Sequence, residues 1–128
     1  MATGISTYAG DQIIDWLTGL DNTPAVGTRY VSLHSDDPGY TGANEIAAGA
    51  HTYARKSLTG SASASRASAN TNLLQWLDMP AVTVAYVGIW DALVAGNFLW
   101  GGAMTVPKIP NAGDEFRIAI GDLDMTMP

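Results

Sequence analysis

The feature that most constrains this chain is a change in hydrophobic period after its first twenty residues. Residues 6–20 place apolar side chains at helical spacing, whereas residues 28–127 form short runs rich in β-branched and aromatic residues. Turn-forming residues separate these runs about every 8–12 positions, and no helical segment lies between them. The runs are 29–34, 53–58, 73–77, 81–90, 97–100, 104–106, 115–120 and 123–127. We predict a mainly β fold, an antiparallel β-sandwich or Greek-key barrel of about seven or eight short strands with one N-terminal α-helix.

The predicted helix over 6–20 has one apolar stripe with spacing i, i+3, i+4 and i+7. The stripe consists of Ile13, Trp16, Leu17 and Leu20. Ser6 or Thr7 can cap the start, and Gly19 followed by Pro24 ends the helix. The stripe suits packing on the chain's own sandwich and packing on a neighbouring molecule equally well, so the sequence leaves both open.

Length and side-chain size predict the rest of the organisation. A chain of 128 residues corresponds to one domain, with the β-sandwich over 28–127. Trp76 and Trp90 are expected in its core, and Phe116, Ile118 and Ile120 are expected to point inward. Gly101-Gly102 suggests a bulge or tight bend between two strands. Residues 59–72 contain no bulky apolar side chain, so we expect a mobile loop or an edge that orders on contact.

Charge excludes several kinds of partner. Only 14% of the residues are charged, against an average of about 25%, which is typical of a protein that lies against neighbours. The net charge of −6 disfavours nucleic acid and anionic membrane surfaces. The apolar runs are shorter than the roughly 20 residues of a membrane span. Residues 1–20 lack a basic start followed by an apolar run, so we expect no secretory signal.

Serines are plentiful, but nucleophilic catalysis also needs a base such as histidine, and the chain has only two, His34 and His51. We expect no enzyme and no catalytic residue. Ser32, His34 and Asp36 occupy alternate positions and could share one strand face. No serine lies in a Gly-x-Ser-x-Gly turn. We therefore interpret the three residues as a solvated strand end that leads into a turn.

The acidic loop after this strand offers oxygen ligands for a cation. Asp36, Asp37 and Glu45 bracket a glycine-containing loop, but their spacing does not match an EF-hand. We interpret the loop as a turn in which Asp36 accepts from backbone N–H groups two residues on, with a calcium site as the open alternative. Gly101-Gly102 lacks the lysine and helix of a phosphate-binding loop. We predict no metal and no cofactor.

The distribution of charge is more informative than its total. Residues 46–77 contain no acidic residue and carry three bases, Arg55, Lys56 and Arg66, while the rest of the chain has a net charge of −9. Either this stretch is simply solvated, or it is a docking surface for an acidic partner. Trp100, beside two glycines at a hairpin end, is a further candidate anchor. The candidate partner interface therefore comprises Arg55, Lys56, Arg66 and Trp100.

Three blocks of sequence follow one another at characteristic spacing: YVSLHSDDPG at 30–39 with GANE at 42–45, YARK at 53–56, and VGIWDA at 87–92 with GNFLWG at 96–101. In order and spacing, they resemble a family of small virion proteins of tailed bacteriophages, described as head decoration or tail-fiber-like proteins. The resemblance continues in order through the glycine-rich turns near 113 and 121. The chain differs by Asp37, where a small residue is usual, and by a longer Ser/Ala run at 59–72.

The resemblance implies a structural virion protein and no catalytic residues. The expected role is a capsid decoration (cement) protein on the outer surface of the virion. Copies, expected as homo-oligomers with a trimer favoured, would staple neighbouring major capsid protein subunits. The alternative is a tail fiber, baseplate or receptor-binding tail protein, in which Trp100, Tyr40 and Tyr53 could bind a host glycan.

Overall fold

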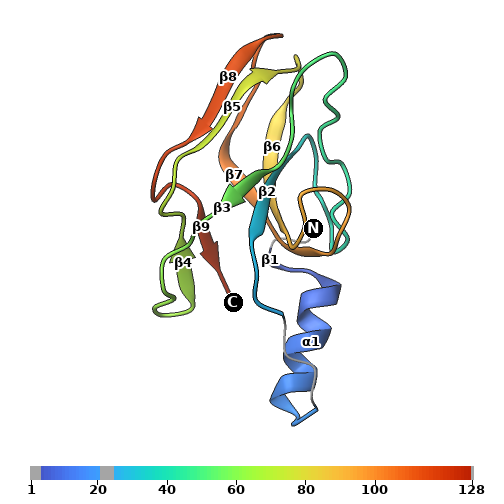
Figure 1. Cartoon of the computed structure of the whole chain (residues 1–128), viewed down its shortest axis with the longest axis vertical. Coiled ribbons are helices and arrows are strands. Elements are labelled where there is room, and N and C mark those ends of the chain that lie inside the picture. Colours follow the sequence, from blue (N-terminus) through green and yellow to red (C-terminus); the bar gives the residue numbers. More distant parts are fainter. Residues whose placement is uncertain (1–3, 21–24, 128) are drawn as a thin grey trace.

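Two layers of different construction form the β-sandwich of the computed structural model, which describes residues 4–20 and 25–127 (Figure 1). The first layer is one five-stranded antiparallel sheet in the order β1-β7-β6-β2-β3. Its strands are β1 (Gly4–Ile5), β2 (Arg29–His34), β3 (Lys56–Leu58), β6 (Val84–Trp90) and β7 (Phe98–Lys108). The second layer consists of two antiparallel ribbons, β4 with β9 and β5 with β8. Its strands are β4 (Ala67–Ala69), β5 (Leu74–Met79), β8 (Asp114–Ile118) and β9 (Asp124–Thr126). The predicted fold class is confirmed.

One hydrophobic core joins the layers. Trp76 of β5 is 1% exposed, and its ring centroid lies 5.8 Å from that of Phe116 on β8. The indole N–H of Trp76 donates to the carbonyl of Ala54 at 2.7 Å, so this large side chain is buried without an unpaired polar group. The first sheet contributes alternate residues of β2, as period-two patterning requires. From β6 it contributes two residues three positions apart, and the pairing of β6 with β7 is irregular between them. The buried members are Val31, Leu33, Ile46, Leu74, Trp76, Met79, Val84, Val87, Phe116 and Leu123.

The runs 97–100 and 104–106 are one strand, β7, and not two separate strands. The two glycines lie inside it and give space to aromatic rings, because a Cβ on Gly102 would lie 2.4 Å from the indole of Trp100. A Cβ on Gly101 would likewise meet the ring of Phe98 at 2.9 Å. The pairing of β7 with β6 is irregular at two other places, between Val84 and Tyr86 and between Ile89 and Trp90, and the second lies beside Trp100.

The segment 59–72 is not a plain loop. It forms a narrow arm with bridges between Gly60 and Asn70 and between Ala64 and Ala67, and it contains β4, which pairs with β9. Small residues suffice here because backbone groups make the contacts. The Ser68 hydroxyl adds a bond to the carbonyl of Ser61 at 2.8 Å. The expectation of a mobile loop overlooked this pairing, whereas the other expectation, a strand edge, agrees with the presence of β4.

The helix α1 (Thr7–Leu17) has the predicted start and an earlier end. Ser6 is the N-cap, and its hydroxyl accepts from the N–H of Ala9 at 3.0 Å. Gly19 has a left-handed backbone with φ 89°, its N–H donates to the carbonyl of Trp16, and the N–H of Leu20 donates to that of Asp15. This Schellman motif stops the helix. The stop assigned to Pro24 lies outside the described residues.

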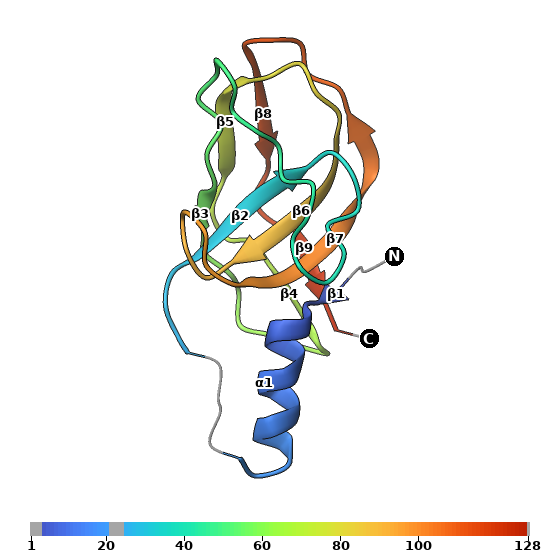
Figure 2. The same cartoon turned by 90° about the vertical axis from the view of Figure 1, so that its right-hand side faces the viewer.

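The helix projects from one end of the sandwich along the long axis of the molecule (Figures 1 and 2). Its first turns contact β7, where Ala9 is buried and Ile13 is half-buried. Further along, the predicted stripe is uncovered, since Trp16 is 56% and Leu17 65% exposed. At 11 residues, the helix of the described chain is too short to cross a membrane.

The prediction that Phe116, Ile118 and Ile120 all point into the core is only partly correct. Phe116 is buried and Ile118 is half-buried, but Ile120 is 64% exposed. Strand β8 ends at Ile118, and the following turn is closed by the N–H of Asp122, which donates to the carbonyl of Ala119. The alternation therefore stops before it reaches Ile120.

Candidate interaction surfaces

Ser32, His34 and Trp90 form a hydrogen-bonded chain inside the first sheet. The Ser32 hydroxyl lies 2.7 Å from Nε2 of His34, and the Trp90 indole N–H donates to the same hydroxyl at 2.8 Å. Nδ1 of His34 lies 2.7 Å from the carbonyl oxygen of Ala43. Since an indole N–H only donates and a carbonyl only accepts, Ser32 donates to Nε2, and Nδ1–H donates to Ala43. Burial lowers the pKa of His34, which favours this neutral form.

The interpretation of these residues as a solvated strand end is wrong for two of the three. Ser32 and His34 are both 0% exposed and lie beneath Gly88, where a Cβ would come within 2.8 Å of each. Asp36 belongs to the exposed loop and accepts from the N–H of Asp37 at 2.8 Å. The three side chains therefore do not form a catalytic triad.

The loop after His34 is an aspartate-supported turn, as expected, but Asp37 makes the bond to the residue two positions on. Its carboxylate accepts from the N–H of Gly39 at 2.9 Å. Glu45 binds Arg55. Within residues 4–20 and 25–127, no group of three His, Asp or Glu side chains is arranged to hold a metal ion.

All three nitrogens of the Arg55 guanidinium group donate hydrogen bonds to other groups of the protein. Nε and one terminal nitrogen donate to the Glu45 carboxylate at 3.0 and 2.8 Å, and the other terminal nitrogen donates to the carbonyls of Ala92 and Ala95. The plane lies over Trp90, with 3.8 Å from the guanidinium carbon to the ring centroid. The side chain is 8% exposed. Arg55 therefore attaches the β6–β7 loop to the sheet.

Glu45 and Tyr53 complete this cluster. The Tyr53 hydroxyl donates to Glu45 at 2.9 Å and accepts from the N–H of Leu33 at 3.0 Å. Burial raises the pKa of Glu45, but the hydrogen bonds from Arg55 and Tyr53 outweigh it and hold that pKa below its usual range. Burial also raises the pKa of Tyr53. The cluster is thus an ion pair with a neutral phenol beside it.

The four predicted interface residues do not lie on one surface. Arg55 is turned inward, and Lys56 is half-buried on β3. Arg66 is exposed at the tip of the arm, with φ 63°, and its carbonyl accepts from the N–H of Met127. Trp100 is half-buried, and its indole N–H donates to the carbonyl of Thr126 at 3.3 Å. Arg66 and Trp100 therefore both form hydrogen bonds with the C-terminal segment of the chain.

Beside Trp100, a hollow of about 370 Å³ opens between β7 and the β8–β9 segment. It exists because, within the described residues, β8 pairs only with β5 and β9 only with β4. Apolar side chains of the core line it together with four charged side chains. The charged residues are Lys108, Arg117, Asp122 and Asp124. No local sequence pattern indicates this group, because its members come from separate segments that only the fold brings together.

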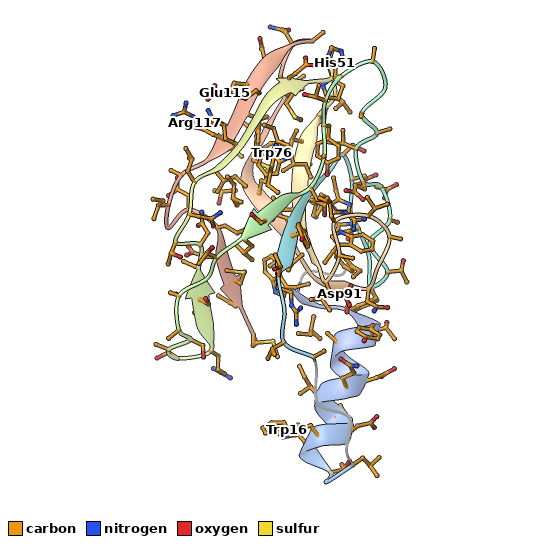
Figure 3. All side chains as sticks on the ribbon, in the orientation of Figure 1. Trp16, His51, Trp76, Asp91, Glu115 and Arg117 are labelled. Carbon is orange, nitrogen blue, oxygen red and sulfur yellow. The ribbon has the colours of Figure 1, made fainter. Side chains whose placement is uncertain are left out.

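Large apolar side chains gather at two exposed places. One is the projecting part of α1, where Trp16 points outward beyond the sandwich (Figure 3). Ile14, 59% exposed, borders the predicted stripe there and was missed. The other is the tip of the β6–β7 loop, where Leu93 is 49% and Val94 79% exposed. The low charge content of the chain was the signal for such surfaces.

Comparison with known families gives a match over nearly the whole chain. Residues 4–126 match the family model of the Podophage GP4 fiber I protein gp80. The chain belongs to this fiber protein family. The match runs from β1 to β9, and it confirms the resemblance to tailed-phage virion proteins. This member of the fiber protein family is a structural virion protein of a tailed phage. No curated protein matches the chain.

Proposed function

We propose that this chain is a fiber component of the phage tail. The observation that carries the proposal is the match of residues 4–126 to a family whose named member is a podophage fiber protein. The outline of the molecule supports it, because the helix extends the long axis of the sandwich (Figure 2). An elongated subunit with an apolar end suits end-on attachment better than a flat contact with a shell.

The interior supports a structural and not a catalytic role. The residues with catalytic potential, Ser32 and His34, are buried and hydrogen-bonded to Trp90 and Ala43. Within the described residues, every buried side-chain nitrogen and oxygen has a hydrogen-bond partner. These polar groups stabilise the sandwich, and its outer surfaces remain for contacts with other virion proteins.

A capsid decoration protein that binds the major capsid protein is the second candidate. One observation favours it: residues 46–77 contain no acidic residue, and Lys56 and Arg66 carry positive charge there. The observation is weakened by Arg55, whose charge is paired with Glu45. A docking surface for an acidic shell would therefore depend on two bases and not on three.

Electron microscopy of purified particles with a gold-labelled antibody tests the proposal. A fiber component is expected to carry label at the tail, in far fewer copies than the major capsid protein on a stained gel. Label spread evenly over the head, at a copy number close to that of the shell protein, would overturn the proposal in favour of decoration. In that case the double variant Lys56→Glu/Arg66→Glu should lose occupancy more strongly at low salt.

A further inference from the structure

The register of β2 with β6 places two opposite charges across from each other. Tyr30 pairs with Trp90. One position further, Arg29 at the start of β2 therefore lies opposite Asp91, directly after β6. A cation and an anion in such positions usually stabilise a sheet as a cross-strand pair. Here they do not meet, because none of the ion pairs between described residues joins Arg29 to Asp91.

Each of the two side chains is bound to a different loop. One terminal nitrogen of Arg29 donates to the carbonyl of Ala25, on the segment that leads into β2. The Asp91 carboxylate accepts from the backbone N–H and the side-chain amide of Asn97, at 2.7 and 2.9 Å. Burial raises the pKa of Asp91, but the hydrogen bonds from Asn97 and the charge of Arg29 outweigh it and hold that pKa below its usual range. Both side chains are therefore charged, and each is held on its own side.

Both charges line one cavity of about 170 Å³. Tyr8 and Gln12 of α1 line it from a second element, and residues 25–28 ahead of β2 line it from a third. Asp91 lies where the helix meets the sandwich (Figure 3). Segments far apart in the sequence therefore build this space, which we call the Arg29–Asp91 cavity.

The Arg29–Asp91 cavity also has an apolar wall. The hydroxyl of Tyr8 accepts from the side-chain amide of Gln12 at 3.0 Å, which limits the rotation of the tyrosine ring. Leu99 of β7, which is half-buried, lines the same cavity. In small-molecule sites, such apolar side chains contact the body of the ligand while a few polar groups fix its orientation. The cavity offers both kinds of contact.

We propose that the Arg29–Asp91 cavity binds a free α-amino acid. The ligand carboxylate binds the guanidinium group of Arg29, the ligand ammonium binds Asp91, and the ligand side chain packs on Leu99. A zwitterion is favoured because it neutralises both charges at once. An anion without a cation is repelled by Asp91, and a cation without an anion is repelled by Arg29. A neutral ligand displaces water from two charges and supplies no charge in return.

The size of the cavity limits the ligand to a single small amino acid. Sites for drug-sized ligands measure about 300–1,000 Å³, whereas this cavity has about 170 Å³. A short branched side chain suits the wall formed by Tyr8 and Leu99, so L-valine is the probe. The inference concerns the isolated chain and does not depend on the location of the protein in the virion. It can therefore fail while the proposed fiber role stands.

A nuclear magnetic resonance titration of the full chain with L-valine tests the binding. We expect saturable shifts of the backbone amides of Gly27 and Thr28, with a dissociation constant on the order of 1 mM, as is usual for a ligand of so few atoms. The amides of β8, in the other layer, should not shift. L-Valinamide lacks the carboxylate and N-acetyl-L-valine lacks the ammonium, so each should bind at least about tenfold more weakly.

Two variants remove the site in different ways. Arg29→Gln keeps a polar side chain but takes away the cation that binds the ligand carboxylate. Gly27→Leu keeps both charges and fills the cavity, because Gly27 lines it and a Cβ there has its nearest contact at 3.7 Å, with Arg29. Each variant is expected to raise the dissociation constant for L-valine at least about tenfold. Arg117→Gln, at an exposed arginine on β8, is the matched control and should bind as the wild type does.

An absence of saturable shifts up to 50 mM L-valine would overturn the proposal. So would equal binding of L-valine, L-valinamide and N-acetyl-L-valine, since a site for a zwitterion must distinguish them. Unchanged binding in Gly27→Leu would place the ligand elsewhere and overturn the assignment of the cavity. Dispersed amide spectra of both variants establish that the sandwich is folded, and if Arg29→Gln does not fold, Gly27→Leu decides the test.

Discussion

The guanidinium plane of Arg55 lies over the indole ring of Trp90, 3.8 Å from its centroid, while its edges bind Glu45 and two loop carbonyls. Arg55 thus joins the sheet, the acidic loop and the β6–β7 loop at one point. Only a planar cation with several donors can make these contacts together. The arrangement explains why a base from the positively charged stretch is directed inward.

Replacing Arg55 by lysine is therefore expected to destabilise the fold, although the positive charge is kept. A single ammonium cannot bind the Glu45 carboxylate and the carbonyls of Ala92 and Ala95 at once. We expect a loss of about 2–4 kcal/mol in the free energy of unfolding, measured by urea denaturation. The control Arg66→Lys, at an exposed site, should change it by less than about 0.5 kcal/mol. Similar losses in the two variants would contradict the assigned role.

Acid is expected to weaken the fold through His34. Its pKa is below the ordinary value of 6.5, so the unfolded chain takes up the proton first. The contribution of His34 to stability is complete above pH 6.5 and declines as the pH falls below that value towards its folded pKa. One proton gives a slope of at most about 1.4 kcal/mol per pH unit.

Urea denaturation of wild type and His34→Gln from pH 5 to pH 7 measures this difference. His34→Gln is less stable throughout but should have a flatter pH dependence. His51 is present in both proteins and cancels in the comparison. Val84→Ala, which shortens a fully buried residue without a titrating group, should keep the wild-type slope. Parallel curves for wild type and His34→Gln would rule out the effect.

Gly88 is expected to tolerate no side chain. A Cβ there would lie 2.7 Å from the Ser32 hydroxyl and 2.8 Å from both Nε2 of His34 and the ring of Phe98. Gly88→Ala should therefore cost about 2–4 kcal/mol of unfolding free energy in thermal or urea melts. Gly27→Ala is the control, because its nearest atom is the flexible end of Arg29 at 3.7 Å, and it should be nearly neutral.

Asn70 is expected to be the most sensitive polar position. Its amide nitrogen donates to the carbonyls of Asn72 and Ala119, and its oxygen accepts from the N–H groups of Gly121 and Leu123. Asn70→Asp turns both donors into acceptors that face carbonyls, which should cost about 3 kcal/mol or more.

Amide hydrogen exchange of the more conservative Asn70→Ala locates this effect. The amide of Leu123 loses its acceptor and should exchange faster than the global loss of stability requires, whereas the amide of Gly121 also donates to the main-chain carbonyl of residue 70 at 2.9 Å, which the substitution keeps. The amides of β2 and β6 should follow global stability alone. Unchanged protection of Leu123 would show that the Asn70 side chain does not support the β8–β9 turn.

Local sequence patterns predicted the helix and most strands well, because helix capping and strand alternation depend on residues that are close in sequence. The N-cap at Ser6, the strand 29–34 and the burial of Trp76 follow from capping chemistry, alternation and size. The prediction of two separate strands on either side of Gly101-Gly102 was wrong, because glycine in a strand marks a close approach of another group as often as a break. Here the close approach is that of the Trp100 ring.

The surfaces were harder to predict, because they depend on contacts between distant residues. Arg55 and Arg66 are alike in the sequence, yet one is paired with Glu45 and the other lies at an exposed tip. The stripe around Trp16 shows the same ambiguity, since an apolar face has the same spacing whether its own sheet or another molecule covers it. Asn70 gave no local signal, because its partners lie up to 53 positions away.

Trp100 has a mechanical consequence. Its backbone pairs with Ile5 of β1, and its indole N–H donates to Thr126 of β9, so both ends of the described chain are fastened at one residue. Tension applied between Ile5 and Thr126 would load the two-residue pairing of β1 with β7, the indole hydrogen bond of Trp100 and the pairing of Thr126 with Ala67 of β4. Strands β2 and β6 lie outside this path, so the ends would peel away while the body kept its shape.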